Sequence, residues 1–160
     1  MRWAIEDVPN PAVIRIHVDE ELTTRTIESC PPAKPPDLLA PLLDIEGVRS
    51  LEPHRYRVRV NLSPGADVGE AVAEVMRHRA GAPHPLPQEE LPRAFETPAR
   101  RGRVVAESLE MAAGDPLAER LFRTEGVAEA IIGEGVTLIR LGRLFGWADL
   151  EAAVRDVLDP

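Results

Sequence analysis

Hydrophobic and polar residues follow the same order twice along the chain. The tripeptide Glu46-Gly47-Val48 returns as Glu125-Gly126-Val127, at an offset of 79 residues. In each copy the pattern predicts a short apolar helix before the tripeptide, and two strands and a closing helix after it. The sequence therefore predicts two tandem units with one plan, repeat 1 over residues 1–79 and repeat 2 over residues 101–160.

Alternation of apolar and polar residues predicts strands in repeat 1, and apolar runs on both sides of the turn Gly133-Glu134-Gly135 predict a hairpin in repeat 2. The expected strands are Ala12–Asp19, Val48–Glu52 and Tyr56–Leu62 in repeat 1, and Val127–Ile132 and Val136–Leu141 in repeat 2. Ala12–Asp19 has one apolar and one polar face. Val136–Leu141 is apolar on both faces over most of its length, which predicts a cover on each side. The second cover would be repeat 1 or another subunit of a homodimer.

The helices can be assigned from their ends. The apolar helix of repeat 1 is expected over Leu38–Ile45 and that of repeat 2 over Pro116–Arg123. Asp115 is expected to cap the second helix, and Gly47 and Gly126 to end the two helices in the left-handed conformation. The closing helices are amphipathic: one follows Asp67, its expected cap, and the other begins near Trp147.

Between the repeats, residues 80–100 contain five prolines and are expected to form an extended linker. Residues 101–106 are expected to take the place of the Ala12–Asp19 strand in repeat 2. The predicted fold class is α/β of the α+β type. It consists of two tandem repeats, each a small, largely antiparallel sheet with helices on one face, packed pseudo-symmetrically.

These segments resemble a known domain family. Residues 8–16 and 42–51 are similar to the opening and middle of the NifU-like scaffold (Nfu) N-terminal domain. Repeat 1 is particularly similar to the domain that opens the conserved virulence factor C-like proteins. Repeat 2 is similar to the better-known form of the Nfu N-terminal domain, through residues 115–122, 125–127, 135–139 and 147–150.

The resemblance implies a non-enzymatic interaction or scaffold-accessory protein, associated with iron–sulfur cluster assembly and its assembly or recipient proteins. In the larger Nfu proteins a Cys-x-x-Cys pair in a separate domain holds the cluster. This chain has a single cysteine, Cys30, so it is not expected to hold a cluster itself. No cofactor and no metal are predicted.

Composition and charge restrict the classes of molecule that the protein is expected to bind. The chain has 19 basic and 27 acidic residues, for a net charge of −8, and both halves are negative. This charge disfavours binding to a nucleic-acid backbone. No apolar run is long enough to span a bilayer, and the amino terminus lacks the apolar core of a signal peptide. The expected location is the cytoplasm.

The residues that could act as a nucleophile, as metal ligands or as a catalytic pair are each better explained without such a role. Cys30 is expected to be a free surface thiol in a proline-rich loop, because no basic cluster is near it in the sequence. The four histidines, at positions 17, 54, 78 and 84, lack the spacing of metal ligands. Adjacent glutamates, as at 20–21 and 89–90, point to opposite faces of an extended chain and do not form a catalytic pair.

One candidate interaction face can be drawn from the sequence. Alternation places Arg55, Arg57 and Arg59 on one side of the predicted strand. Arg15 and His17 would share this side if the first strand lies next to it. The face would suit an acidic protein partner, or RNA as an alternative; the simpler interpretation is a solvated face balanced by carboxylates.

A third hypothesis is a small enzyme with its site between the repeats. No set of catalytic residues is visible in the sequence. A deep cleft with convergent titratable groups would favour this hypothesis, and a flat, well-packed junction would argue against it.

Overall fold

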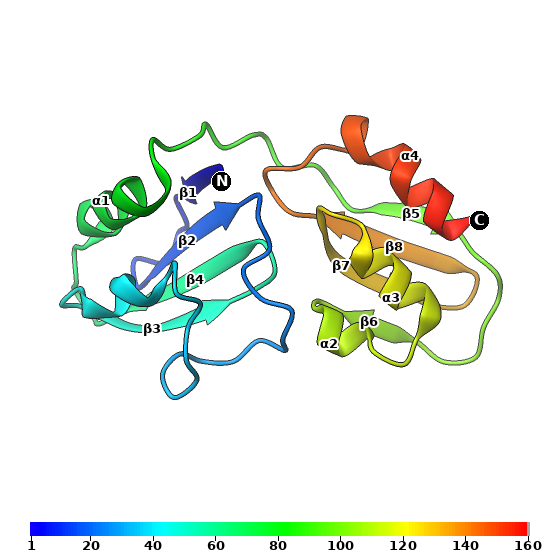
Figure 1. Ribbon diagram of the computed structural model, residues 1–160, viewed down its shortest axis with the longest axis horizontal. Helices are drawn as coiled ribbons and strands as arrows, with labels where there is room; N and C mark the ends of the chain where they lie inside the picture. Colours follow the sequence, from blue (N-terminus) through cyan, green and yellow to red (C-terminus); the bar gives the residue numbers. More distant parts are fainter. Residues whose placement is uncertain (160) are drawn as a thin grey trace.

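The computed structural model describes residues 1–159 and contains two four-stranded antiparallel sheets that lie next to each other (Figure 1). Pro160, the last residue of predicted repeat 2, lies outside the described residues. In chain order the elements are β1 (Trp3–Glu6), β2 (Val13–Val18), η1 (Ala40–Asp44), β3 (Val48–Pro53), β4 (Arg57–Leu62), α1 (Gly69–Ala80), β5 (Arg93–Glu96), β6 (Val104–Ala106), α2 (Leu109–Ala112), α3 (Pro116–Arg123), β7 (Val127–Ile132), β8 (Val136–Leu141) and α4 (Trp147–Leu158).

Three strands are arranged in the same way in both sheets. The strand order is β1-β2-β4-β3 in the first sheet and β5-β8-β7-β6 in the second. The β3–β4 hairpin corresponds to the β7–β8 hairpin, and β2 pairs with β4 as β5 pairs with β8. The counterpart of β2 is therefore β5, and the prediction that residues 101–106 fill this role was wrong. Those residues lead into β6, at the other edge of the sheet.

Local details repeat at the same offset as the sequence. The register of β3 with β4 shifts between Val48 and Ser50, and that of β7 with β8 shifts between Val127 and Glu129. Each shift is a β-bulge, which bends its strand. The glycine before each bulged strand accepts a hydrogen bond at its carbonyl oxygen from the residue after the hairpin, over 2.8 Å in the first unit and 2.9 Å in the second. The units thus agree in fine structure as well as in strand order.

The fourth strands lie on opposite edges of the two sheets. β1 extends the first sheet beyond β2, and β6 extends the second sheet beyond β7. At the β3 edge of the first sheet, Cys30 is the only one of residues 1–159 that pairs, through two backbone hydrogen bonds of 2.8 Å with Leu51. A single bridging residue thus stands in the first unit where a short strand stands in the second.

Each sheet buries one face under its own helices. In β4 the inward residues are Val58, Val60 and Leu62, and these pack with residues of η1 and α1. In β8 the residues of the same alternation are buried under α3 and α4. The two cores are separate clusters. Helices on one face of each antiparallel sheet confirm the predicted α+β class with two tandem units.

The helix ends follow the sequence in the second unit more closely than in the first. Asp115 accepts a hydrogen bond from the backbone N–H of Ala118, at 3.0 Å, and caps α3 as predicted. Asp67 does not cap α1, which follows Val68 without a side-chain cap. The helix expected over residues 38–45 is a 3₁₀ helix over residues 40–44, with Pro41 in its first turn.

The proline-rich segment after α1 passes from the first unit to the second (Figure 1). Its last part forms β5, so the second sheet begins inside the range that was predicted to be linker. Glu90, just before β5, accepts a hydrogen bond at 2.9 Å from the backbone N–H of Trp147, the first residue of α4. The segment is therefore attached to the second unit. Among residues 1–159, no helix has both the length and the apolar character that crossing a bilayer requires.

Candidate functional site

Arg55 connects the two units. It lies in the turn between β3 and β4 and is only 5% exposed. Its guanidinium donates hydrogen bonds to the carbonyl oxygens of Phe122, at the end of α3, and Val127, at 2.5 and 2.8 Å. Its Nε donates to Glu21 at 2.7 Å. A cation at the carboxyl end of a helix also interacts favourably with the helix dipole.

Tyr56, the next residue, completes this contact. Its hydroxyl oxygen accepts a hydrogen bond from the backbone N–H of Gly126 at 2.9 Å, and its ring meets that of Phe145 edge to face, with 4.9 Å between the centroids. A Cβ atom at Gly142 would lie 2.9 Å from the Cβ of Tyr56. The turn of one unit therefore fits against the two glycines that flank the hairpin of the other.

Further hydrogen bonds hold the units together away from this turn. The backbone N–H of Glu110, in α2, donates to the carbonyl oxygen of Thr24 at 2.9 Å. The guanidinium of Arg2 donates to the carbonyl oxygen of Leu144 at 3.3 Å. These contacts, together with Arg55 and Tyr56, set the relative position of the two sheets.

A cleft of about 350 Å³ lies between the two units. The first unit lines it with residues of β1, β2, β4 and the β3–β4 turn, and the second with residues of β7, β8 and the segments around Glu89 and Glu107. Most of its side chains are charged, and both signs are present. A cleft with these dimensions has the size of a small-molecule site.

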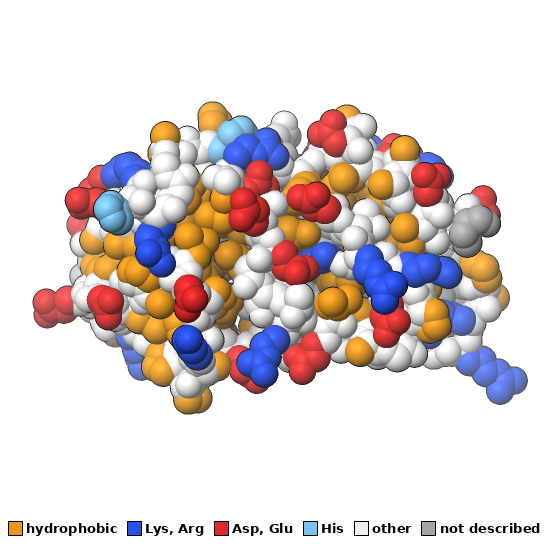
Figure 2. All heavy atoms as spheres, viewed as in Figure 1, with side chains coloured by type: hydrophobic (Ala, Val, Ile, Leu, Met, Phe, Trp, Pro, Cys, Tyr) orange, Lys and Arg blue, Asp and Glu red, His pale blue; other side chains and the backbone are white. Residues whose placement is uncertain are grey.

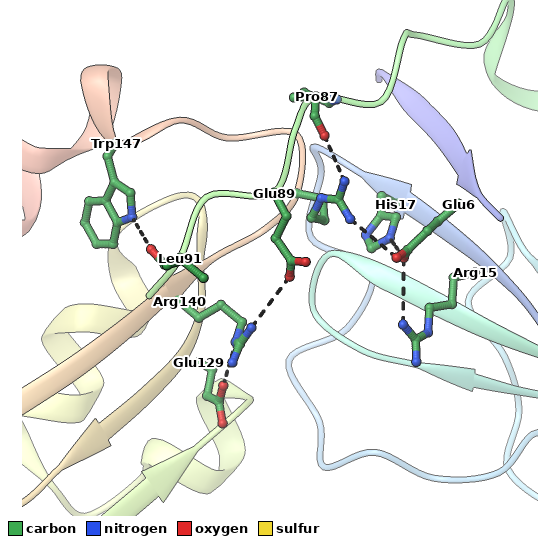
Figure 3. Close-up of polar contacts among 10 residues, drawn as sticks. Glu6, Arg15, His17, Pro87, Glu89, Leu91, Glu129, Arg140 and Trp147 are labelled. Atoms are coloured by element: carbon green, nitrogen blue, oxygen red, sulfur yellow. Dashed lines mark hydrogen bonds and ion pairs between the residues drawn. The ribbon is translucent and has the colours of Figure 1, made fainter. Parts of the chain in front are cut away.

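Glu6 is the centre of one group of charges in the cleft. It accepts a hydrogen bond from His17 Nε2 at 2.7 Å and pairs with Arg143 at 3.4 Å and Arg15 at 3.9 Å (Figure 3). Burial alone would raise the pKa of Glu6, but the hydrogen bond from His17 and the neighbouring arginines lower it. Glu6 is therefore held in its ionised form.

Arg140 is the centre of a second group. It donates from Nε to Glu129 at 3.0 Å and lies 3.8 Å from Glu89, which comes from the linker (Figure 3). The partners of Arg140 come from the linker and the second unit, whereas Arg143 pairs across the junction with Glu6. The charges of these two groups are thus largely matched within the cleft.

Two charged residues of the cleft are left without a partner. Within residues 1–159, neither Arg57 nor Glu107 forms an ion pair or a side-chain hydrogen bond, and both line the cleft. Burial lowers the pKa of Arg57, and the charge of Arg15 lowers it further, whereas Glu107 opposes this change. The two residues therefore face the same space without satisfying each other.

His54 completes the lining of the cleft on the side of the β3–β4 turn. Burial and the charge of Arg57 lower its pKa to about 4, with Glu52 acting in the opposite direction and Arg15 and Arg59 in the same one. The imidazole is therefore neutral near pH 7. At that pH His54 can donate a hydrogen bond to a ligand or accept one from it, but it is a weak base.

The low pKa of His54 makes folding depend on pH. Between about pH 6.5 and 4 the unfolded chain binds a proton at His54 that the folded chain does not, so stability falls as the pH falls through this window. We expect the free energy of unfolding to be about 1 kcal/mol lower at pH 5 than at pH 7 from this residue, after allowing for its partial exposure. Urea unfolding of the wild type and His54→Gln at both pH values measures the difference.

His17 acts in the same direction, because burial also lowers its pKa. Between pH 7 and pH 5 the wild type therefore loses more unfolding free energy than His54 alone accounts for. The informative quantity is how much smaller this loss becomes in His54→Gln. His78→Gln, at an exposed position on α1, is the matched control. An equal loss in His54→Gln and His78→Gln would contradict the assignment.

The structure divides the interaction face that the sequence predicted. β4 begins at Arg57, so Arg55 precedes the strand and does not share its alternation. His17 is only 3% exposed and is bound to Glu6. Arg15, opposite Arg59 in the ladder, and Arg57 stay on the open side of the sheet. Four of the five residues, all except Arg59, line the cleft instead of forming one external patch.

The remaining arginines of that face are close to carboxylates. Arg15 lies 3.9 Å from Glu6, and Arg59 lies 3.5 Å from Glu52. On the side of the molecule seen in Figure 2, acidic and basic side chains are likewise interspersed. RNA binding prefers a continuous basic surface with accessible aromatic rings, and Tyr56 is buried. The RNA alternative stays a prediction without geometric support.

Cys30 is not a surface thiol, contrary to the prediction. It is 2% exposed, because its backbone pairs with Leu51 and its side chain enters the first core. Burial raises the pKa of the thiol, and nearby Glu28 adds to the effect, so the reactive thiolate is disfavoured. Within the described part of the chain, no group of three His, Cys, Asp or Glu residues could hold a metal ion.

The outer face of the second sheet differs from the expectation for β8. Val136 is 48% exposed and Leu138 is partly exposed, so repeat 1 does not cover this face. Within residues 1–159, α3 and α4 cover one face of β8, and the other face is open. A cover by another subunit stays a prediction.

Sequence reasoning missed most of the second unit's contribution to the cleft. Glu107, Glu129, Arg140 and Arg143 lie far from the first unit's residues in sequence, and only the junction brings them together. The one available signal was Arg140, a charge within an otherwise apolar strand. No family model, curated protein or solved structure matches the chain, so a function for it can be inferred only from its own residues and their geometry.

Proposed function

We propose that this protein is a non-enzymatic binding protein that holds a small polar ligand in the cleft between its two units. The observation that carries the proposal is the cleft itself, about 350 Å³ in volume and lined by charged residues of both sheets. Sites for small molecules are concave, few per protein and common at junctions between domains.

The rigid surroundings of the cleft support binding. Arg55 and Tyr56 fix one unit against the other with hydrogen bonds to Phe122, Gly126 and Val127. When the walls of a site are held in place before the ligand arrives, ordering them on binding costs little free energy. The geometry therefore favours a preformed site.

The titratable groups that meet in the cleft also bear on the enzyme hypothesis. His54 is the only histidine of the lining without a side-chain hydrogen bond among residues 1–159, but its pKa of about 4 is far below the value that suits a general base at neutral pH. The carboxylate of Glu6 is occupied by His17 and arginines. This arrangement favours binding over catalysis.

Filling the cleft tests the proposal. Ala128 lines the cleft on β7, and we expect Ala128→Phe to occupy the space without adding charge. Ala94→Phe, at an exposed position of β5 outside the cleft, is the matched control. The measurement is the melting temperature of each protein with and without the small-molecule fraction of a cell extract.

The wild type and Ala94→Phe should be stabilised by the extract, because a ligand that binds only the folded state raises the melting temperature. Ala128→Phe should not be. An equal rise in all three proteins would place the ligand elsewhere. No rise in the wild type would contradict the proposal.

The protein partner and the association with iron–sulfur assembly follow from the resemblance alone and stay predictions. The cleft is compatible with either, because a binding protein can present its ligand to a partner. The buried Cys30 makes no separate contribution to that interpretation.

A further inference from the structure

The charges of the cleft indicate which class of ligand it fits, on the premise that the cleft is the binding site of the proposed function. Ion pairs within the protein join Glu6 to Arg143 and Glu129 to Arg140, and the buried Nε of Arg143 has no hydrogen-bond partner among residues 1–159. Arg57 and Glu107, one of each sign, line the same cleft and form no ion pair within residues 1–159. Together with the free Nε–H of Arg143, these two charges define what a ligand must still supply.

Arg57 favours a ligand that has an anionic group. Its guanidinium carries N–H donors that no group of residues 1–159 accepts, and it lies near two further arginines, Arg15 and Arg140. The side chain is partly buried, and its planar guanidinium matches a carboxylate with two parallel hydrogen bonds. A carboxylate placed against Arg57 would supply the missing acceptors.

Glu107 makes a purely anionic ligand unfavourable. An anion at Arg57 would share the cleft with Glu107 and with the carboxylates of Glu6, Glu89 and Glu129. A purely cationic ligand would meet the arginines of the same lining. A ligand that carries both charges avoids each repulsion and gives both unpaired residues a partner.

We propose that the cleft binds a small amphoteric molecule, whose carboxylate is held by Arg57 and whose ammonium group is held by Glu107. The neutral His54 is beside Arg57 and can donate or accept one further hydrogen bond. The volume of about 350 Å³ lies in the range of small-molecule sites and leaves ample room for an amino acid or a larger amphoteric molecule.

A series of simple amino acids tests this inference. The probes are glycine, β-alanine, γ-aminobutyrate and longer unbranched ω-amino acids, each beside its N-acetyl derivative and its carboxamide. The N-acetyl derivative lacks the cation and the carboxamide lacks the anion. Binding to the full chain is measured by chemical-shift changes and calorimetry. The length that binds best reports the spacing between the two charged groups.

We expect at least one free amino acid to bind on the order of tenfold more tightly than both of its derivatives, because each charged contact is lost in one of them. Arg57→Gln should weaken binding of the free amino acid by a similar factor. Glu107→Gln should remove the preference for the free amino acid over its N-acetyl derivative. Arg59→Gln, next on the same strand face but outside the cleft, should change nothing.

Three outcomes would overturn the inference. The first is an N-acetyl derivative or carboxamide that binds the wild type as tightly as the free amino acid does. The second is the absence of binding for the whole series. The third is binding that Arg57→Gln and Glu107→Gln leave unchanged. The proposed function fails separately, if the extract stabilises Ala128→Phe as much as the wild type.

Discussion

Replacing Arg55 with alanine should lower the free energy of unfolding by about 3 kcal/mol. The side chain is buried between the two units and donates to two backbone carbonyl oxygens, of Phe122 and Val127, and to Glu21. Its removal leaves these acceptors without a donor and opens a space against Phe122. Equilibrium unfolding in urea, followed by circular dichroism, measures the loss.

The same variant should also change how the protein unfolds. The two cores are separate clusters, and Arg55 is the main buried polar link between them. We expect a single transition in the wild type and two separable transitions in Arg55→Ala. Arg59→Ala, an exposed arginine in the same hairpin, should change the free energy of unfolding by no more than about 0.5 kcal/mol. A loss below about 1 kcal/mol in Arg55→Ala would show that the junction does not depend on this residue.

Replacing Gly126 with alanine should cost about 3 to 4 kcal/mol. Gly126 has a φ of +91°, a conformation that side chains disfavour. In addition, a Cβ atom there would collide with Leu150 Cδ1 and lie 2.9 Å from the ring of Phe145. The second core and the seat of Tyr56 would both have to move. Thermal and urea unfolding measure the effect.

Gly65→Ala separates the two contributions. Gly65 also has a positive φ, of +76°, but a Cβ atom there would meet nothing within 4 Å. This variant should therefore lose only about 1 kcal/mol, from backbone strain alone. Equal losses at the two glycines would mean that the close packing around Gly126 relaxes without cost.

The elements with strong local signals could be read from the sequence. The strands Val127–Ile132 and Val136–Leu141 and the helix Pro116–Arg123 have the predicted bounds. Apolar runs on both sides of a glycine turn mark the strands, and a proline after a capping aspartate marks the start of the helix. The edge strands β1 and β5 were not predicted, and β6 lies within residues 101–106, which were predicted as a strand but at the wrong edge of the sheet. They have four residues or fewer and lie among prolines or charges, so pairing with a neighbour and not their own pattern makes them strands.

The candidate site was predictable only in part. The arginines of β2 and β4 were identified as a possible contact surface, but their burial in a cleft depends on the position of the second unit. Arg55 shows the reason: alternation describes residues within a strand, and Arg55 lies in the turn before it. The resemblance to the NifU-like scaffold N-terminal domain stays a prediction about ancestry and partners.

The bulge that β3 and β7 share separates what the two units have in common from what differs between them. An extra residue at the same register position gives both hairpins the same local bend. The outer strands differ, because β1 has no counterpart in the second sheet and β6 corresponds to a single bridging residue in the first. The common part is a three-stranded sheet, and each unit lengthens a different edge of it. The cleft belongs to neither unit alone, so a protein cut between the two units would lose the cleft even if both sheets still folded.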